Sequence, residues 1–325
     1  MTHPLPEGEG VTSQIRIGVS SCLLGEKVRY DGGHKHDRYL TDILGRFFQF
    51  VPVCPEVECG MSIPREAMRL EGDPAAPRLV TNRTRIDKTG QMLDFCRKKV
   101  VELEGEDLCG FIFKKDSPSS GLYRVKVYNQ GVPAKSGSGL FAAAVVRHFP
   151  LLPVEEEGRL NDPHIRENFI ERVFTLRRWK DFLRGEKSIG ALVTFHTSHK
   201  LLVMAHSPSH YREMGALVAH GTEMPLDQLL ERYRHLLTEA MALHATVSKQ
   251  TNVLHHIMGY FKKVLTAAEK AELVEVIARY HDHLVPLIVP LTLLNHYVAK
   301  YNQTYLRGQI YLTPHPAELM LRNHV

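Results

Sequence analysis

The chain has 325 residues, of which 43% are hydrophobic and 24% are charged, and its formal net charge is +5. This composition is typical of a globular protein, and the length suffices for two domains that each bury a core. No apolar run reaches the roughly 18 residues of a membrane span, and the first residues lack a signal-peptide pattern. We therefore expect a cytoplasmic protein without a membrane anchor, and its positive charge permits a polyanionic partner without requiring one.

The first half of the chain alternates strand and helix patterns. Apolar runs at 15–21, 48–54 and 110–114 predict strands, and the segments 39–47, 91–105 and 140–149 predict helices. This alternation indicates a Rossmann-like α/β domain with a parallel or mixed sheet, which we place at residues 1–155. Ligands of such sheets bind outside the carboxyl ends of the strands. Cys22, the segment 54–61 and the loop 117–121 each follow a strand, so we expect them to meet in one crevice.

Residues 150–163 predict a connector, because prolines, an acidic run and a glycine precede Asp162 and Pro163, which suit a helix cap and a first turn. After this connector, apolar residues recur at helical spacing, while the arginines and lysines of 166–184 fall mostly on the other side. Further helices are predicted at 208–220, 225–247, 251–265, 267–281 and 290–300. The second half, residues 156–325, is therefore predicted to be an all-helical domain.

The cysteines of the chain number five and lie only in its first part. Disulfides are rare in the cytoplasm, so this odd and sparse set indicates a binding site more than a covalent crosslink. Cys22 and Cys54 stand at strand ends, and with Cys59 they are predicted to bind a soft metal centre, either zinc or an iron–sulfur cluster. Cys96 and Cys109 are interpreted as buried packing residues, and Cys109 opens its strand at the end away from the crevice.

Long motifs stand out in both halves of the chain. The first half contains IGVSSCLLGEKVRYDGG (17–33), VCPEV (53–57), GMSIPRE (60–66) and FIFKKDSPSSGLYRVKVYNQG (111–131), and these motifs resemble the thiouracil desulfurase family. The second half contains FHTSHKLLVMAHSPSHYREMG (195–215), TNVLHHIMGYFKK (251–263), PLIVPLTLLNHYV (286–298) and YLTPHP (311–316), and it resembles helical YbgA-like domains. The pairing of the two resembles bacterial desulfidases that convert 4-thiouridine in tRNA to uridine.

The resemblance implies a [4Fe-4S] cluster that three cysteines hold, which leaves one iron open for the substrate. Cys22 and Cys54 match two of these ligands. The third ligand of the family is the cysteine of an SPSCG motif, and this chain has Ser120 at that position. A serine oxygen is a hard and basic ligand, poorly suited to such a site. We therefore predict Cys59 as the third ligand, because it follows Cys54 in the same loop, with Cys109 as the alternative.

The resemblance also implies catalytic and substrate-binding residues. Glu56 matches the glutamate of the Cys-Pro-Glu motif, which acts as a general acid and base, and Ser117 or Ser119 is predicted to assist it. The residues predicted to bind the pyrimidine or its phosphates are Arg29, Tyr30, Asp31, Lys114 and Ser120. The alternative interpretation is structural, with an exposed loop carboxylate, serines that form a turn, and charged side chains that brace the loops.

These residues define a hypothesis for the function. The open iron binds the thiocarbonyl sulfur, and water activated by Glu56 replaces sulfur with oxygen without net redox change. Thiolated tRNA is the predicted partner, bound through the arginines of 166–184 and through Lys249, Lys262 and Lys263. The chain lacks a P-loop and a GxGxxG motif, so ATP and NAD are not expected as cofactors. The alternatives are a desulfidase of free thiouracil and a non-catalytic RNA-binding or redox-sensing protein.

Overall fold

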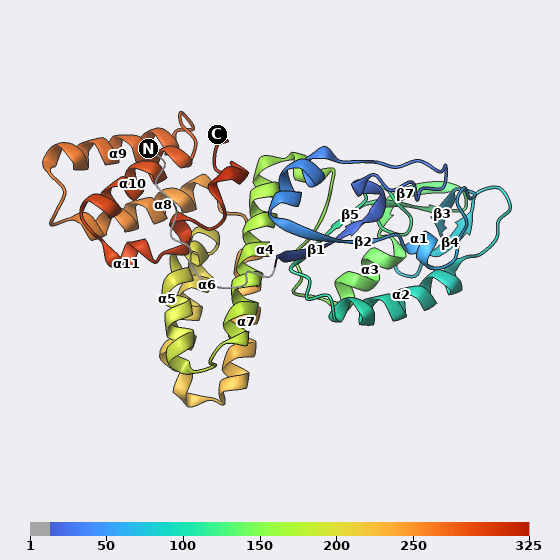
Figure 1. Cartoon of the computed structure of the whole chain (residues 1–325), viewed down its shortest axis with the longest axis horizontal. Coiled ribbons are helices and arrows are strands. Elements are labelled where there is room, and N and C mark those ends of the chain that lie inside the picture. Colours follow the sequence, from blue (N-terminus) through green and yellow to red (C-terminus); the bar gives the residue numbers. More distant parts are fainter. Residues whose placement is uncertain (1–13, 325) are drawn as a thin grey trace.

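A computed structural model describes residues 14–324 (Figure 1). Residues 1–13, where the sequence shows no signal-peptide pattern, lie outside the described residues. The described chain forms an α/β half and a helical half, with the long helix α4 (Pro163–Arg184) between them. No helix in the range 14–324 is long and apolar enough to cross a membrane.

A four-stranded parallel sheet forms the centre of the α/β half. Its strands lie in the order β2 (Phe48–Val53), β1 (Ile15–Ser20), β5 (Gly110–Phe113) and β8 (Val154–Glu156). The three strands predicted from apolar runs are therefore confirmed. The segment 150–163 was wrongly predicted as a plain connector, because β8 lies within it and pairs with β5. β8 is only three residues long and contains two glutamates, so no apolar pattern reveals it.

A second four-stranded sheet, which the sequence analysis did not predict, lies at the end of the α/β half away from the helical half (Figure 1). Its strands are β4 (Arg78–Thr81), β3 (Met68–Glu71), β6 (Val125–Asn129) and β7 (Val132–Gly137), in that order. β3 is antiparallel to β4 and parallel to β6, and β6 is antiparallel to β7. These strands are short and partly charged, which hides them from a search for apolar runs.

Helices cover both faces of the parallel sheet. On one face lie α2 (Thr89–Glu104) and α3 (Leu140–His148), while the short α1 (Pro55–Glu58) directly follows β2. Phe111 and Phe113 of β5 pack there against Phe141 of α3, and all three side chains are buried. Burial of each such ring stabilises the fold by roughly 1.5–3 kcal/mol. The opposite face packs against α4 through Phe169 and Val173.

The helical half has one hydrophobic core, which contains Trp179, Phe195 and Tyr233. Its helices after α4 are α5 (Ile189–His206), α6 (Pro208–Ala219), α7 (Leu226–Ala242), α8 (Val247–Met258), α9 (Ala267–His281), α10 (Ile288–Lys300) and α11 (Thr304–Arg307). The predicted cap of α4 is confirmed, because the Asp162 carboxylate accepts two backbone N–H groups of the first turn. α5 was not predicted, since apolar residues surround it on most sides and give no one-sided pattern. The fold class, an α/β sheet domain followed by helices, is confirmed.

The basic residues of α4 do not form the outer face that the sequence analysis expected. Lys180 donates to the carboxylate of Asp107 at 2.9 Å and to the carbonyl of Leu108 at 2.8 Å, and Arg184 pairs with the same carboxylate. Asp107 and Leu108 directly precede β5. These cations therefore join the helical half to the amino end of a strand, and they are not free for RNA phosphates.

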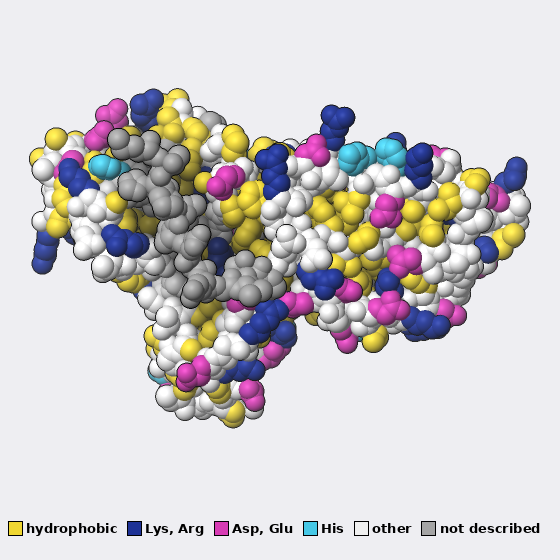
Figure 2. All heavy atoms as spheres, in the orientation of Figure 1, with side chains coloured by type: hydrophobic (Ala, Val, Ile, Leu, Met, Phe, Trp, Pro, Cys, Tyr) yellow, Lys and Arg dark blue, Asp and Glu magenta, His cyan; other side chains and the backbone are white. Residues whose placement is uncertain are grey.

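Other predicted RNA contacts are also used within the protein. Arg178 donates to the carbonyl of Pro314 at 2.5 Å, and Lys249 donates to two carbonyl groups at 2.7 and 2.9 Å. Lys262 and Lys263 remain exposed. Figure 2 shows that the cationic side chains on the face in view are interspersed with acidic ones and do not gather into one patch.

Candidate functional site

A cavity of about 830 Å³ opens at the carboxyl edge of the parallel sheet. Three loops that follow β1, β2 and β5 form its wall, as expected for a sheet of this kind. The predicted site residues on this wall are Cys22, Arg29, Tyr30, Cys54, Glu56, Lys114, Ser117, Ser119 and Ser120. The cavity therefore brings together most of the predicted site, while Asp31 and Cys59 do not line it.

The thiols of Cys22 and Cys54 share this wall. Cys22 lies in a short 3-10 turn after β1, and Cys54 lies at the start of α1 after β2. Burial raises the pKa of the Cys22 thiol to about 11, although the charges of Lys114 and Arg29 lower it. Burial also raises the pKa of Cys54. Both thiols are protonated near neutral pH without a metal, so metal binding would release their protons.

Cys59 lies off the cavity wall and packs against the hydrophobic core that contains Met92 and Cys96. Its Sγ donates to the carbonyl oxygen of Glu56 at 3.2 Å, within the turn that ends α1. The structure therefore does not place Cys59 on the surface that the other two predicted ligands share. Cys109 is fully buried at the start of β5 and also lies off the wall.

Ser120 occupies the wall at the position where the family motif has a cysteine. It is 4% exposed, and its backbone N–H donates to the hydroxyl of Ser117 at 3.1 Å. In the described part of the chain, the Ser120 hydroxyl has no hydrogen-bond partner. At the three positions where the motif predicts cluster ligands, the cavity wall therefore has the thiols of Cys22 and Cys54 and the hydroxyl of Ser120, which makes no hydrogen bond within the described residues.

The carboxylate of Glu56 is fixed in the cavity from both sides. Its Oε2 accepts hydrogen bonds from Nε and one Nη of Arg65, at 2.8 and 2.5 Å. Its Oε1 accepts the hydroxyl proton of Ser119 at 2.7 Å. Because Ser119 has a single hydroxyl proton, the 3.0 Å contact between Ser117 and Ser119 is donated by Ser117. The serines therefore form a chain of hydrogen bonds that ends on the carboxylate of Glu56.

A close backbone contact holds the serine loop in place. The N–H of Gly139 donates to the carbonyl of Gly121 at 2.7 Å, and the N–H of Phe141 donates to that of Ser119 at 2.9 Å. A Cβ at position 139 would lie 2.5 Å from the carbonyl carbon and oxygen of Ser119 and 2.7 Å from the nitrogen of Ser120. Glycine is therefore required at residue 139 for the loop to take its place beside Glu56.

The predicted substrate-binding residues divide into two groups. Lys114 lines the cavity, but its Nζ is bound to the Glu157 carboxylate at 2.6 Å. Arg29 and Tyr30 also line it, and the Arg29 guanidinium lies 5.4 Å from the centroid of the Tyr30 ring. Asp31 lies off the wall, where it accepts the N–H of Gly33 at 3.0 Å. Asp31 is thus placed to shape the loop and not to contact a ligand in the cavity.

Sequence reasoning missed two residues of the site. Arg65, which fixes Glu56, lies in the GMSIPRE motif, yet a lone arginine after a proline carries no signal of its partner. Glu157, which binds Lys114, lies in the acidic run that was interpreted as a connector.

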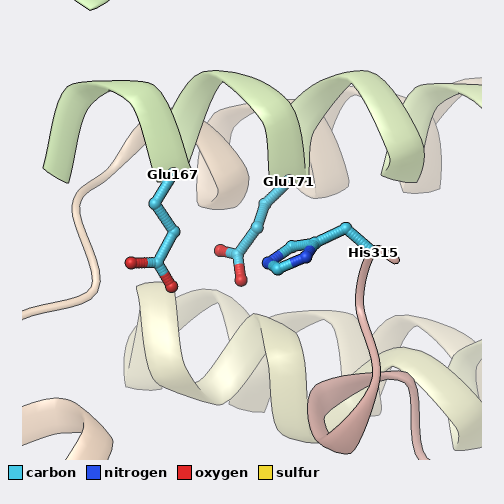
Figure 3. A group of neighbouring side chains, drawn as sticks. All are labelled: Glu167, Glu171 and His315. Carbon is cyan, nitrogen blue, oxygen red and sulfur yellow. The ribbon is translucent and has the colours of Figure 1, made fainter. Parts of the chain in front are cut away.

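The helical half contains a second polar cavity of about 250 Å³. Beside it, Glu167 and Glu171 of α4 lie close to His315, an arrangement that could hold a metal ion (Figure 3). Arg322 donates to both carboxylates, at 3.3 and 2.8 Å, and His206 donates to Glu171 at 2.9 Å. The ring of His206 also contacts a backbone carbonyl at 2.6 Å, and burial raises the pKa of Glu167 to about 8. Both carboxylates therefore have partners within the described residues, and the cluster is explained as a buried network of hydrogen bonds and ion pairs.

Comparisons with known proteins agree with this division of the chain. A model of the 2-thiouracil desulfurase family matches residues 17–157, and a family described as a protein of unknown function (DUF1722) matches residues 200–316. The uncharacterized protein YbgA of Escherichia coli (strain K12) is 30% identical over 165 residues, which span 50% of this chain and 98% of YbgA. A solved structure titled [4Fe-4S]-dependent thiouracil desulfidase TudS shares 28% identity, with a TM-score of 0.38, and the match covers 46% of this chain and 95% of TudS.

The α/β half, with its cysteine and Cys-Pro-Glu loops on one cavity, is therefore similar to the domains of the 2-thiouracil desulfurase family, whose model it matches. It is fused to a helical half, through which the chain belongs to the YbgA family.

Proposed function

We propose that this protein is a desulfidase that removes sulfur from a thiolated pyrimidine and that its substrate is 4-thiouridine in tRNA. The observation that carries the proposal is the Glu56 carboxylate, which Arg65 and Ser119 hold in one cavity with Cys22 and Cys54. The match to the 2-thiouracil desulfurase family supports the class of reaction. The choice of tRNA rests on the resemblance of the two-domain arrangement to tRNA desulfidases.

The side chains of the cavity support a hydrolytic reaction. Glu56 accepts a proton from water at Oε1, while Arg65 pairs with the carboxylate and orients it. The oxygen of this water replaces sulfur at the ring carbon, so C=S becomes C=O and sulfur leaves as sulfide with no net electron transfer. Glu56 passes its proton on to the departing sulfide, Ser117 and Ser119 hold the carboxylate through their hydrogen bonds, and Arg29 and Tyr30 position the pyrimidine.

The donor set fits an iron–sulfur cluster at two of its three cysteine positions, Cys22 and Cys54. A bound cluster would supply a soft and Lewis-acidic iron for the thiocarbonyl sulfur. The third position is the hydroxyl of Ser120, whereas the Cys59 thiol lies off the cavity wall and donates to the carbonyl of Glu56. Iron and sulfide analysis of anaerobically reconstituted Cys59→Ala and Ser120→Ala variants assigns this ligand, because only loss of the true ligand lowers the cluster content.

The reaction is tested by turnover of 4-thiouridine nucleoside and of thiolated tRNA with the reconstituted protein. Glu56→Gln should lower turnover by about 10²–10⁴-fold, because it removes the general base. Glu26→Gln is a matched control, since Glu26 is an exposed carboxylate in the neighbouring loop. Unchanged turnover in the Glu56 variant, or no sulfide release from any thiolated pyrimidine, would contradict the proposal. Turnover of free thiouracil without turnover of tRNA would support the alternative substrate.

A further inference from the structure

A groove of about 760 Å³ lies next to the catalytic cavity. The two share Lys115 and Asp116 as wall residues, so the groove begins where the cavity ends. Its other walls are the segment 122–124, the end of β7 with residues 135–138, and the segment after β8. A polymer whose reactive base occupies the cavity could therefore continue directly into the groove.

The groove is positively charged. Lys115, Arg124 and Lys135 are exposed, and none of their side chains makes an ion pair or hydrogen bond within residues 14–324. The wall also holds two carboxylates, Asp116 and Glu156. Glu156 is buried and accepts the backbone N–H groups of the neighbouring loop at 2.8 and 3.1 Å, whereas Asp116 is exposed, so three exposed cations face one exposed carboxylate. Unpaired cations in a groove are what a phosphate backbone requires.

An aromatic platform stands among these cations. Tyr123 is 42% exposed, and its ring lies 5.0 Å from the guanidinium of Arg159. Arg159 is itself held by the carboxylate of Glu155 at 2.8 Å. The guanidinium therefore supports the tyrosine ring in a fixed position, and a nucleobase can stack on the exposed side of such a ring.

We propose that this groove binds an unpaired RNA segment that flanks the thiolated base. The proposal rests on the proposed function only for the placement of the thiolated base in the cavity. The cations supply phosphate contacts, and Tyr123 supplies a stacking surface that an acidic peptide would not need. The groove also provides the free positive charge that α4 does not offer, because Lys180 and Arg184 of that helix are paired.

The test measures binding of a fluorescent single-stranded oligouridylate without sulfur to the full-length protein, over a series of salt concentrations. The groove variant is Arg124→Glu with Lys135→Glu, and the control is Lys98→Glu with Lys270→Glu, exposed lysines of α2 and α9 with the same charge change. The dissociation constant should rise at least about tenfold in the groove variant and less than about twofold in the control. Removal of two phosphate contacts should reduce the salt slope by about 1.4. Tyr123→Ala should weaken binding by about tenfold or more.

Several results would overturn the proposal. Equal losses in the groove and control variants would mean that RNA is attracted only by overall charge. No binding by the unaltered protein, no effect of the groove variant, or displacement of RNA by poly-glutamate with no effect of Tyr123→Ala would each refute an RNA site. Because this RNA contains no thiobase, the groove can be confirmed even if sulfide release from thiolated pyrimidines fails. In that event the proposed desulfidase function is wrong, and the proposal that the groove binds RNA still holds.

Discussion

Replacement of Arg65 by methionine tests the central ion pair of the site. The side chains of Arg65 and Glu56 are 7% and 13% exposed, and they share two hydrogen bonds. Arg65 also donates to the carbonyl of Val28 at 2.9 Å, which holds the loop after β1 against the loop after β2. Arg65→Met keeps most of the apolar stem of this side chain but leaves Glu56 with Ser119 as its remaining partner.

The expected magnitude follows from burial. Removal of one partner from a buried ion pair costs about 3–5 kcal/mol, and exposed pairs contribute about 0–1 kcal/mol. Since the Glu56 carboxylate borders a cavity, we expect a loss of roughly 3 kcal/mol in the free energy of unfolding. In a Glu56→Gln background the same replacement should cost about 1 kcal/mol, because no charge is left without a partner. The coupling between the two residues is then about 2 kcal/mol.

Urea unfolding of the four proteins of this double-mutant cycle measures the coupling. Arg97→Met is a suitable control, since Arg97 pairs with Asp94 at the surface and the side chains are 72% and 62% exposed. That control should change stability by less than about 1 kcal/mol. The reconstituted Arg65→Met variant should also turn over substrate more slowly than the unaltered protein. An equal cost of Arg65→Met in both backgrounds would refute the inference that Arg65 acts through Glu56.

Three further predictions concern other parts of the molecule. Gly139→Ala should lower desulfidase turnover at least about tenfold by displacing the serine loop, while Gly90→Ala, with no atoms within 4 Å of the new Cβ, should not. Burial lowers the pKa of His199 in the folded protein to about 3, whereas the unfolded chain has the ordinary histidine value of about 6.5. As the pH decreases below about 6.5, the unfolded state takes up a proton that the folded state does not, so the free energy of unfolding decreases. His199→Gln should reduce the loss of unfolding free energy between pH 6.5 and 5.5 by about 1 kcal/mol, whereas exposed His255→Gln should not. Ser120→Cys should strengthen the thiolate absorption band of bound Co²⁺, and an unchanged band would mean that residue 120 does not face the metal.

The parallel sheet could be predicted from the sequence to the extent that its strands are apolar. β1 and β5 are buried between layers of helices, β2 at the edge is partly buried, and all three have the Ile, Val and Phe content that such burial requires. β8 could not be predicted because its glutamates accept backbone and arginine hydrogen bonds within the fold, so it reads as a charged loop. The second sheet was not predicted for a related reason. Its short strands contain charged residues whose partners are distant in the sequence, such as Glu71, which pairs with Arg85.

The cavity could be predicted as a meeting point, but not its inner contacts. Strand ends that share one edge of a sheet bring Cys22, Cys54 and the serine loop together whatever their neighbours are. The position of Cys59 depends instead on which side of a four-residue helix a side chain takes, and spacing along the chain does not determine this. The basic residues of α4 were misinterpreted for the same reason, because a cation on a helical wheel looks identical whether it faces solvent or a carboxylate from another element.

β5 has a consequence for how the two halves of the protein communicate. It is four residues long, about 13 Å from end to end. Asp107, just before the strand, is held by α4, while Lys114, just after it, lies in the catalytic cavity and leads into the serine loop. One short strand therefore carries the contact with α4 at one end and a residue of the cavity wall at the other, so the two halves of the protein meet the cavity through a single rigid element.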